Sequence, residues 1–173
     1  AMAVGTKSTL IAVDTNYLLD LAEEAPASWE ALEIIRRRLP GAIIIVPPTV
    51  IDELAVAHDH AGDADEQRLA EIAVVNLRTK WKFQPVDLVP VGHGIVEQIA
   101  EKIRERGYLP AEEINDSLIL AEASLLNCTL LLSSDNHLLD VPAGPLKLLL
   151  DSHDVSCPLI VSPRRIARDF FQK

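Results

Sequence analysis

The stretch Leu10-Ile11-Ala12-Val13-Asp14-Thr15-Asn16 decides the fold. Its first four residues are apolar without polar alternation, which is typical of a strand that is covered on both faces of a parallel sheet. Asp14 follows the last apolar residue, so this acid stands where the strand ends. A helical pattern comes next, and a strand followed directly by a helix predicts a β-α-β unit.

The same rhythm of short apolar runs and helical patterns continues along the chain. Further strands are predicted at residues 42–46, 83–89, 130–133 and 159–161. Helices are predicted at residues 28–39, 65–81, 95–106, 116–126 and 146–150, after the second strand, and from Pro163 onward. This alternation predicts an α/β fold with a parallel sheet and helices on both faces.

Length and composition indicate one globular unit. The 173 residues are 49% apolar and 24% charged, which suits a single packed domain, expected at residues 8–173. The longest apolar runs, such as residues 42–50, are far shorter than the roughly 20 residues that span a bilayer. We therefore expect a cytoplasmic protein that does not bind membranes. Cys128 and Cys157 make neither a disulfide framework nor a zinc ligand set.

The net charge of -10 restricts how this chain could bind a nucleic acid. A protein that binds the phosphate backbone normally carries a basic surface. Here such a surface must be local, or the binding must be helped by cations or by a partner. Arg164, Arg165 and Arg168 are expected to be solvated on the last helix, and residues 36–38 to complement a helix dipole.

Four acids are predicted to lie at one edge of the sheet. Asp14 and Asp135 follow the first and fourth predicted strands. Glu53 lies in the first turns of the helix after the second strand, and Asp116 begins the helix that leads to the fourth. In open α/β sheets, ligands bind beyond the carboxyl ends of the strands, where the strand order reverses. The four acids are therefore expected to face one cavity, with Glu113 as a candidate neighbour of Asp116.

Each acid also has an ordinary structural interpretation. An acid at the start of a helix commonly caps it, which is worth about 0.3 to 2 kcal/mol. Four caps at one edge of a sheet would, however, repel one another at close range. Cations remove that repulsion, and hard oxygen ligands are what Mg²⁺ or Mn²⁺ prefers. Two such ions about 4 Å apart can activate water against a phosphodiester.

Five sequence blocks, in consistent order, resemble those of the PIN-domain family. They are Val13-Asp14-Thr15-Asn16, residues 48–54 with Glu53, Asn115-Asp116-Ser117-Leu118-Ile119-Leu120-Ala121-Glu122-Ala123, Leu132-Ser133-Ser134-Asp135 and Val161-Ser162-Pro163-Arg164. The resemblance implies a three-layer α/β/α domain with a mostly parallel five-stranded sheet. It also implies Mg²⁺- or Mn²⁺-dependent hydrolysis of RNA, often by homodimers and often by the toxin of a bacterial toxin-antitoxin pair.

The resemblance assigns roles to particular residues. Asp14, Glu53, Asp116 and Asp135 match the catalytic acids that bind the metal. Thr15, Asn16 and Ser133 match positions that support the pocket through hydrogen bonds. The expected partners are an RNA substrate, an antitoxin protein and a second copy of the chain. No substrate-binding residue is assigned.

Two other classes of protein compete with the nuclease. A non-catalytic PIN-like module would bind RNA or protein without cutting, and four retained acids would then have no evident purpose. A metal-dependent phosphatase also places acids at strand ends, but that family requires Asp-x-Asp where this chain has Asp14-Thr15-Asn16. We therefore expect a metal-dependent ribonuclease.

Overall fold

Five parallel strands form the centre of the protein. The structure is a computed structural model and describes residues 8–60 and 62–170. The strands are β1 (Leu10–Val13), β2 (Ile43–Val46), β3 (Gln84–Pro85), β4 (Leu130–Leu132) and β5 (Leu159–Val161). They pair in the order β3-β2-β1-β4-β5, and every pairing is parallel. The predicted five-stranded parallel sheet is confirmed.

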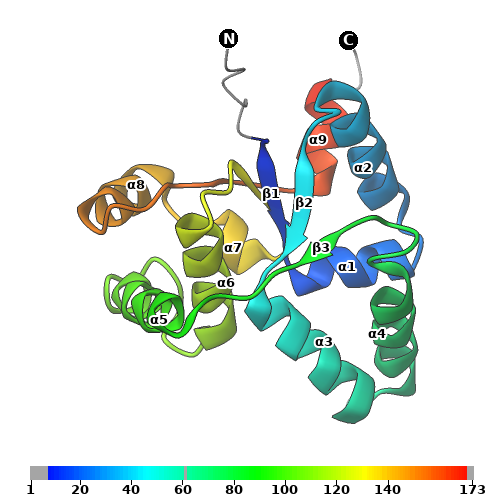
Figure 1. The fold of residues 1–173 in the computed structure, drawn as a ribbon, viewed down its shortest axis with the longest axis horizontal. Coiled ribbons are helices and arrows are strands. Elements are labelled where there is room, and N and C mark those ends of the chain that lie inside the picture. The colour runs from blue at the N-terminus through cyan, green and yellow to red at the C-terminus, as the bar shows by residue number, and fades with distance from the viewer. Residues whose placement is uncertain (1–7, 61, 171–173) are drawn as a thin grey trace, which may run out of the picture.

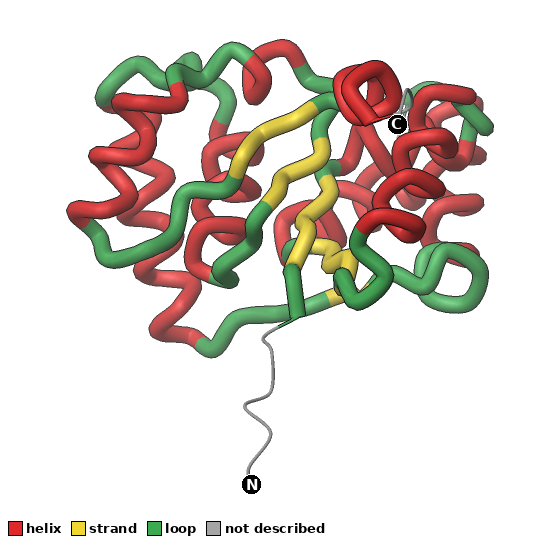
Figure 2. Tube along the Cα trace, turned by 90° about the horizontal axis from the view of Figure 1, so that it is seen from above, coloured by secondary structure: helices red, strands yellow, loops and turns green. Residues whose placement is uncertain are grey.

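Helices connect the strands and cover the sheet. They are α1 (Thr15–Ala22), α2 (Pro26–Arg38), α3 (Pro48–His60), α4 (Ala64–Asn76), α5 (Pro90–Glu105), α6 (Ile114–Leu125), α7 (Asn136–Leu139), α8 (Ala143–Ser152) and α9 (Pro163–Phe170). Figure 2 shows the strands between two groups of helices. In Figure 1, α2 and α9 pack together on one side, and α5, α6 and α8 lie on the other. This is the expected α/β/α arrangement.

The strand order places a switch point beside β1. The chain runs from β1 outward to β2 and β3, then crosses the sheet to β4 and β5. The connection after β1 therefore leads to one side of the sheet and the connection after β4 to the other. A crevice opens between the carboxyl ends of these two strands. The backbone N–H of Asp14 donates to the carbonyl of Leu132 at 3.1 Å, so the β1–β4 ladder continues up to the first candidate acid.

The burial of the strands explains why their sequences lack alternation. Ile11, Ala12 and Val13 are completely buried, as are Leu131 and Leu132 of β4. These residues belong to one continuous hydrophobic core that includes side chains from both helical layers. Each large aliphatic side chain buried in this way contributes roughly 1.5 to 3 kcal/mol. No helix among the described residues is long and apolar enough to cross a membrane.

Several predicted boundaries differ from the observed ones. The strand predicted at residues 83–89 is too long, since β3 covers only Gln84–Pro85. It is an edge strand, and Pro85 has no N–H to donate. Helix α4 ends at Asn76 rather than at residue 81, whereas α5, α6 and α8 begin earlier than predicted. The four-residue helix α7 was not predicted, because one turn is too short to produce a periodic pattern.

Candidate metal centre

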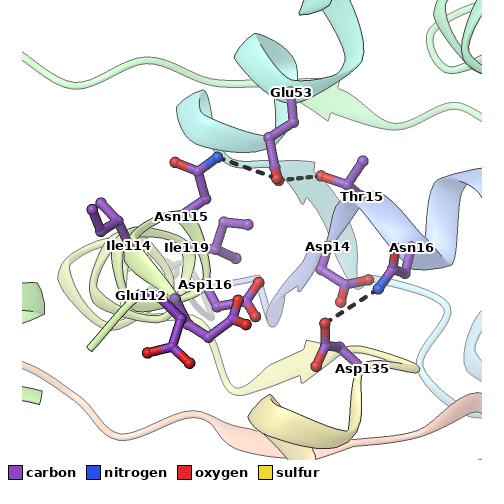
Figure 3. Close-up of a pocket in the computed structure, with 11 residues that line it drawn as sticks. Asp14, Thr15, Asn16, Glu53, Glu112, Ile114, Asn115, Asp116, Ile119 and Asp135 are labelled. Carbon is purple, nitrogen blue, oxygen red and sulfur yellow. Dashed lines mark hydrogen bonds between the residues drawn. The ribbon is translucent and has the colours of Figure 1, made fainter. Parts of the chain in front are cut away.

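An acidic pocket of about 480 Å³ opens at the carboxyl ends of β1 and β4. All four acids predicted to converge line it, which Figure 3 shows in close-up. Its carboxylates are those of Asp14, Glu53, Glu112, Glu113, Asp116 and Asp135. Asp52 lies in the adjoining hollow, which is lined by residues of α1 and α3. The pocket thus gathers negative charge from four separate segments of the chain.

Asp14 is the most deeply buried of these acids. Its residue is only 2% exposed, and it caps α1 by accepting a hydrogen bond from the N–H of Tyr17 at 2.8 Å. Its other oxygen accepts a short hydrogen bond from the hydroxyl of Ser133. Burial raises the pKa of Asp14 to about 7, although both hydrogen bonds lower it and the charges of Asp135 and Glu53 raise it further. Asp14 is therefore a cap that also faces a cluster of like charges.

Asp135 is held beside Asp14 by the same hydroxyl. The N–H of Asp135 donates to the Ser133 hydroxyl oxygen at 3.0 Å, so Ser133 links the two acids. Asp135 caps α7 through the N–H of His137 at 2.8 Å. The amide of Asn16 donates to the second oxygen of Asp135 at 3.4 Å (Figure 3). For both aspartates, capping and convergence occur together, so these two interpretations of the sequence were not exclusive.

Glu53 enters the pocket from α3 and is held at both oxygens. The hydroxyl of Thr15 donates to one oxygen at 2.5 Å, and the amide of Asn115 donates to the other at 3.3 Å. Figure 3 shows this chain of contacts across the top of the pocket. Thr15 and Asn115 come from α1 and α6, so the carboxylate is oriented by two elements other than its own.

Asp116 differs from Asp14, Glu53 and Asp135 because one of its oxygens is buried without a hydrogen-bond partner among the described residues. It is the third residue of α6, and its buried Oδ2 has no hydrogen-bond partner in the described part of the chain. Burial raises the pKa of Asp116 to about 7, and the charges of Asp135, Glu113, Asp14 and Glu53 raise it too. Leaving a buried polar oxygen unpaired costs about 1 to 3 kcal/mol. A cation in the pocket would remove that cost.

The donor set therefore fits a hard divalent cation. It offers carboxylate oxygens, neighbouring hydroxyl and amide groups, and space for water, which is the environment that Mg²⁺ and Mn²⁺ require. As the side chains stand, no three acid, histidine or cysteine groups within residues 8–60 and 62–170 are close enough to ligate one ion. Coordination would thus require rotation of the carboxylates toward one another, which their mutual repulsion otherwise opposes.

The sequence did not predict the contacts that Glu122 makes behind the pocket. Glu122, in the middle of α6, is only 2% exposed and accepts from the N–H of Thr49 at 3.1 Å and from its hydroxyl at 2.6 Å. Burial raises the pKa of Glu122, and the two hydrogen bonds lower it. The sequence signal that could have identified Glu122 is that it is a lone acid inside an otherwise apolar helical run. Asn115 and Glu112 gave no such sign, because each looks like an ordinary surface residue near a helix start.

Comparisons with known proteins agree with this geometry. The PIN domain family model matches residues 11–144, which include all four converging acids. The fold is similar to the solved structure of VapBC2 from Rickettsia felis bound to a DNA fragment from their promoter. That match has a TM-score of 0.61 and 13% identity, and it covers 89% of this chain and 98% of the other. No curated protein sequence matches. Because the family model spans most of the sequence, this chain belongs to the PIN domain family.

Proposed function

We propose that this protein is a metal-dependent endoribonuclease whose catalytic site is the acidic pocket. The observation that carries the proposal is the convergence of Asp14, Glu53, Asp116 and Asp135, together with the unpaired Oδ2 of Asp116. PIN domains are generally nucleases that use divalent metals, which supports hydrolysis of a phosphodiester. We also propose that residues 8–173 act as one domain.

The proposed chemistry divides the work among the residues of the pocket. Asp14, Glu53, Asp116 and Asp135 would hold Mg²⁺ or Mn²⁺, which would supply an activated water and neutralise charge on the scissile phosphate. Asn16 orients the carboxylate of Asp135, whose backbone N–H is held by Ser133. Ser133 also orients the carboxylate of Asp14, and Thr15 orients that of Glu53. Such supporting hydrogen bonds fix the direction in which a carboxylate presents its oxygens.

The test is cleavage of labelled RNA by the purified full chain with Mn²⁺, with Mg²⁺ and with chelator. We expect cleavage with either metal and none in chelator, and loss of activity in Asp116→Asn. That variant keeps the side-chain shape but replaces an anionic oxygen with an amide that binds cations poorly. Asp154→Asn is the matched control, because Asp154 is exposed and lies outside the acidic pocket. Full cleavage by metal-free protein would exclude this mechanism.

The same assay separates the competing functions. Single-stranded DNA and a generic phosphomonoester should be included beside RNA. Release of phosphate from the monoester alone would establish a phosphatase, and metal-independent RNA binding without any cleavage would establish a binding module. By family resemblance we further propose a homodimer and an antitoxin partner. Sedimentation of the purified chain and co-purification with the product of a neighbouring gene test these two proposals.

A further inference from the structure

A second hollow, of about 520 Å³, lies where β5 runs into α9. We call it the α9 groove. Its apolar lining is Leu139, Ile160 and Val161, and its charged lining is Arg164, Arg165 and Arg168. All three arginines are exposed, and the first and last are four residues apart, so they share one face of α9. The groove therefore combines an apolar surface with a row of guanidinium groups.

The α9 groove is positive in a strongly acidic protein. Asp169 pairs with Arg165 at 3.4 Å and with Arg168 at 3.0 Å. Three guanidinium charges and this one carboxylate leave a local charge of about +2, whereas the whole chain carries -10. A polyanion approaching this molecule is repelled by most of its surface. It can be attracted only where positive charge is gathered, as it is here.

The groove and the acidic pocket share the same structural elements. Asp135 caps the first turn of α7, and Leu139, the last residue of that helix, lines the groove. A helix of four residues is only about 6 Å long, so the two sites are close neighbours. In addition, the N–H of Ser133 donates to the carbonyl of Val161 at 3.1 Å, while the hydroxyl of Ser133 contacts Asp14. One hydrogen-bonded strand pair thus carries residues of both sites.

We propose that the α9 groove binds the backbone phosphates of the RNA strand that enters the acidic pocket, and this rests on the proposed ribonuclease function. Guanidinium groups bind phosphate oxygens through paired N–H donors in a fixed fork. Arg164 and Arg168 are the principal contacts. Within the part of the chain that the structure describes, Arg164 has no ion-pair partner, and Arg168 shares Asp169 with Arg165. The aliphatic lining offers an apolar surface to a base that lies between two phosphates.

The test measures RNA binding by the full chain as a function of salt, in chelator so that no cleavage occurs. The probe is a fluorescein-labelled single-stranded RNA of roughly 12 nucleotides, read by anisotropy. The groove variant is Arg164→Gln/Arg168→Gln. The control is Arg78→Gln/Arg106→Gln, which removes two exposed arginines outside the groove and lowers the net charge equally. Thermal melts establish that both variants are folded.

Each phosphate contact in a single strand contributes about 0.7 to the slope of log K against log salt. Loss of two contacts should therefore lower the slope by about 1.4 and weaken binding about 25-fold at 0.1 M salt. The control should keep the slope of the unmodified protein. Arg164→Lys/Arg168→Lys should keep most of it, because the charge remains. Equal affinity and slope in the groove variant and the unmodified protein would overturn the proposal, as would equal weakening in the control.

Cleavage, measured separately with Mn²⁺, keeps this inference distinct from the proposed function. If the unmodified protein cuts RNA but the groove variant binds RNA with unchanged affinity, the groove proposal fails and the nuclease proposal stands. If RNA binding depends on the groove arginines but no cleavage occurs with either metal, the groove stands and the nuclease fails. In the nuclease, the groove variant should raise KM for long RNA far more than it lowers kcat, because the lost phosphate contacts are made equally in the bound substrate and in the transition state.

Discussion

The carboxylate of Glu122 in α6 accepts two hydrogen bonds from Thr49 in the first turn of α3. One comes from the backbone N–H, which has no partner within its own helix at that position. The contact therefore caps α3 from a neighbouring element. Helix α3 carries Glu53 one turn later, and α6 carries Asp116, so this buried pair fixes the two sides of the acidic pocket relative to each other.

Glu122→Ala should destabilise the protein by about 1 to 3 kcal/mol, because it leaves the N–H and hydroxyl of Thr49 buried without an acceptor. Glu122→Gln keeps one acceptor oxygen and should lose less. Urea unfolding of both variants measures the difference. The control is Glu101→Ala, at an exposed position of α5, which should change stability by less than about 0.5 kcal/mol. Equal stability of Glu122→Ala and the control would show that the pair does not hold α3.

Metal-free protein should lose stability as the pH rises from 5 to 8. The pKa values of Asp14 and Asp116 are both raised, from the ordinary value of 3.8 to about 7. A carboxyl group whose pKa is raised by folding contributes stability that is fully present below its unfolded pKa. That contribution is lost as the pH passes through the folded pKa. Melts in chelator at a series of pH values measure the loss, and a flat profile would contradict the burial of these charges.

Asp116→Asn should stabilise the metal-free protein at pH 8, because it removes a charge that is buried among other acids. After allowance for partial solvent screening, the gain should be about 1 to 2 kcal/mol, or roughly 2 to 8 °C in Tm. At pH 5 the gain should shrink, since Asp116 is then mostly protonated in the folded protein and no longer places a charge among the other acids. If the variant is no more stable than the unmodified protein at pH 8, the charge of Asp116 does not destabilise the folded protein.

Added Mn²⁺ should stabilise the unmodified protein strongly. A ligand at a hundredfold excess over its Kd adds about 2.7 kcal/mol to the free energy of unfolding. Asp14→Asn should gain much less, because it lacks the most buried ligand proposed for the ion. Asp154→Asn loses the same charge at an exposed position with φ of 56°, which asparagine tolerates, and should respond to Mn²⁺ like the unmodified protein. No shift in any of the three would exclude a metal site.

Ser133→Ala should weaken Mn²⁺ binding about 10- to 100-fold, as loss of a supporting hydrogen bond typically does. The hydroxyl donates to the carboxylate of Asp14 and accepts from the backbone N–H of Asp135, so its removal frees the Asp14 carboxylate and loosens the backbone that carries Asp135. Titration of Mn²⁺ followed by thermal melts gives the apparent Kd. Ser156→Ala, which removes a hydroxyl that donates to the carbonyl of Ser124 away from the acidic pocket, is the control. An unchanged Kd in Ser133→Ala would show that the hydroxyl of Ser133 does not support metal binding.

Local pattern was sufficient for most of the fold but only for part of the site. Strands β1, β2, β4 and β5 were predicted to within one residue at each end, because runs of buried aliphatic residues are distinctive. The start of α5 was missed because Gly92 and Gly94 obscure its pattern, although Gly92 packs closely on Leu88 in the structure.

Contacts between distant segments could not be predicted in this way. The acids at strand ends were found because topology brings the ends of parallel strands to one edge. The Glu122–Thr49 pair spans 73 residues and the Asn115–Glu53 pair spans 62. Neither pair can be inferred from spacing or composition, since each depends on how α3 and α6 pack. The unpaired oxygen of Asp116 is likewise a property of the packed protein alone.

The pairing of β1 with β4 also bears on how the protein is synthesised. The hydrogen bond between Ser133 and Asp14 joins residues 119 positions apart, and β1 finds its β4 neighbour only after the later part of the chain has been made. A growing chain that ends before β4 carries Asp14, Glu53 and Asp116 but lacks Ser133 and Asp135. At a synthesis rate of about 5 to 20 residues per second, the 119 positions between Asp14 and Ser133 take roughly 6 to 24 s to make. For an enzyme proposed to cut RNA, a nascent chain that ends before β4 would thus lack a complete acidic pocket.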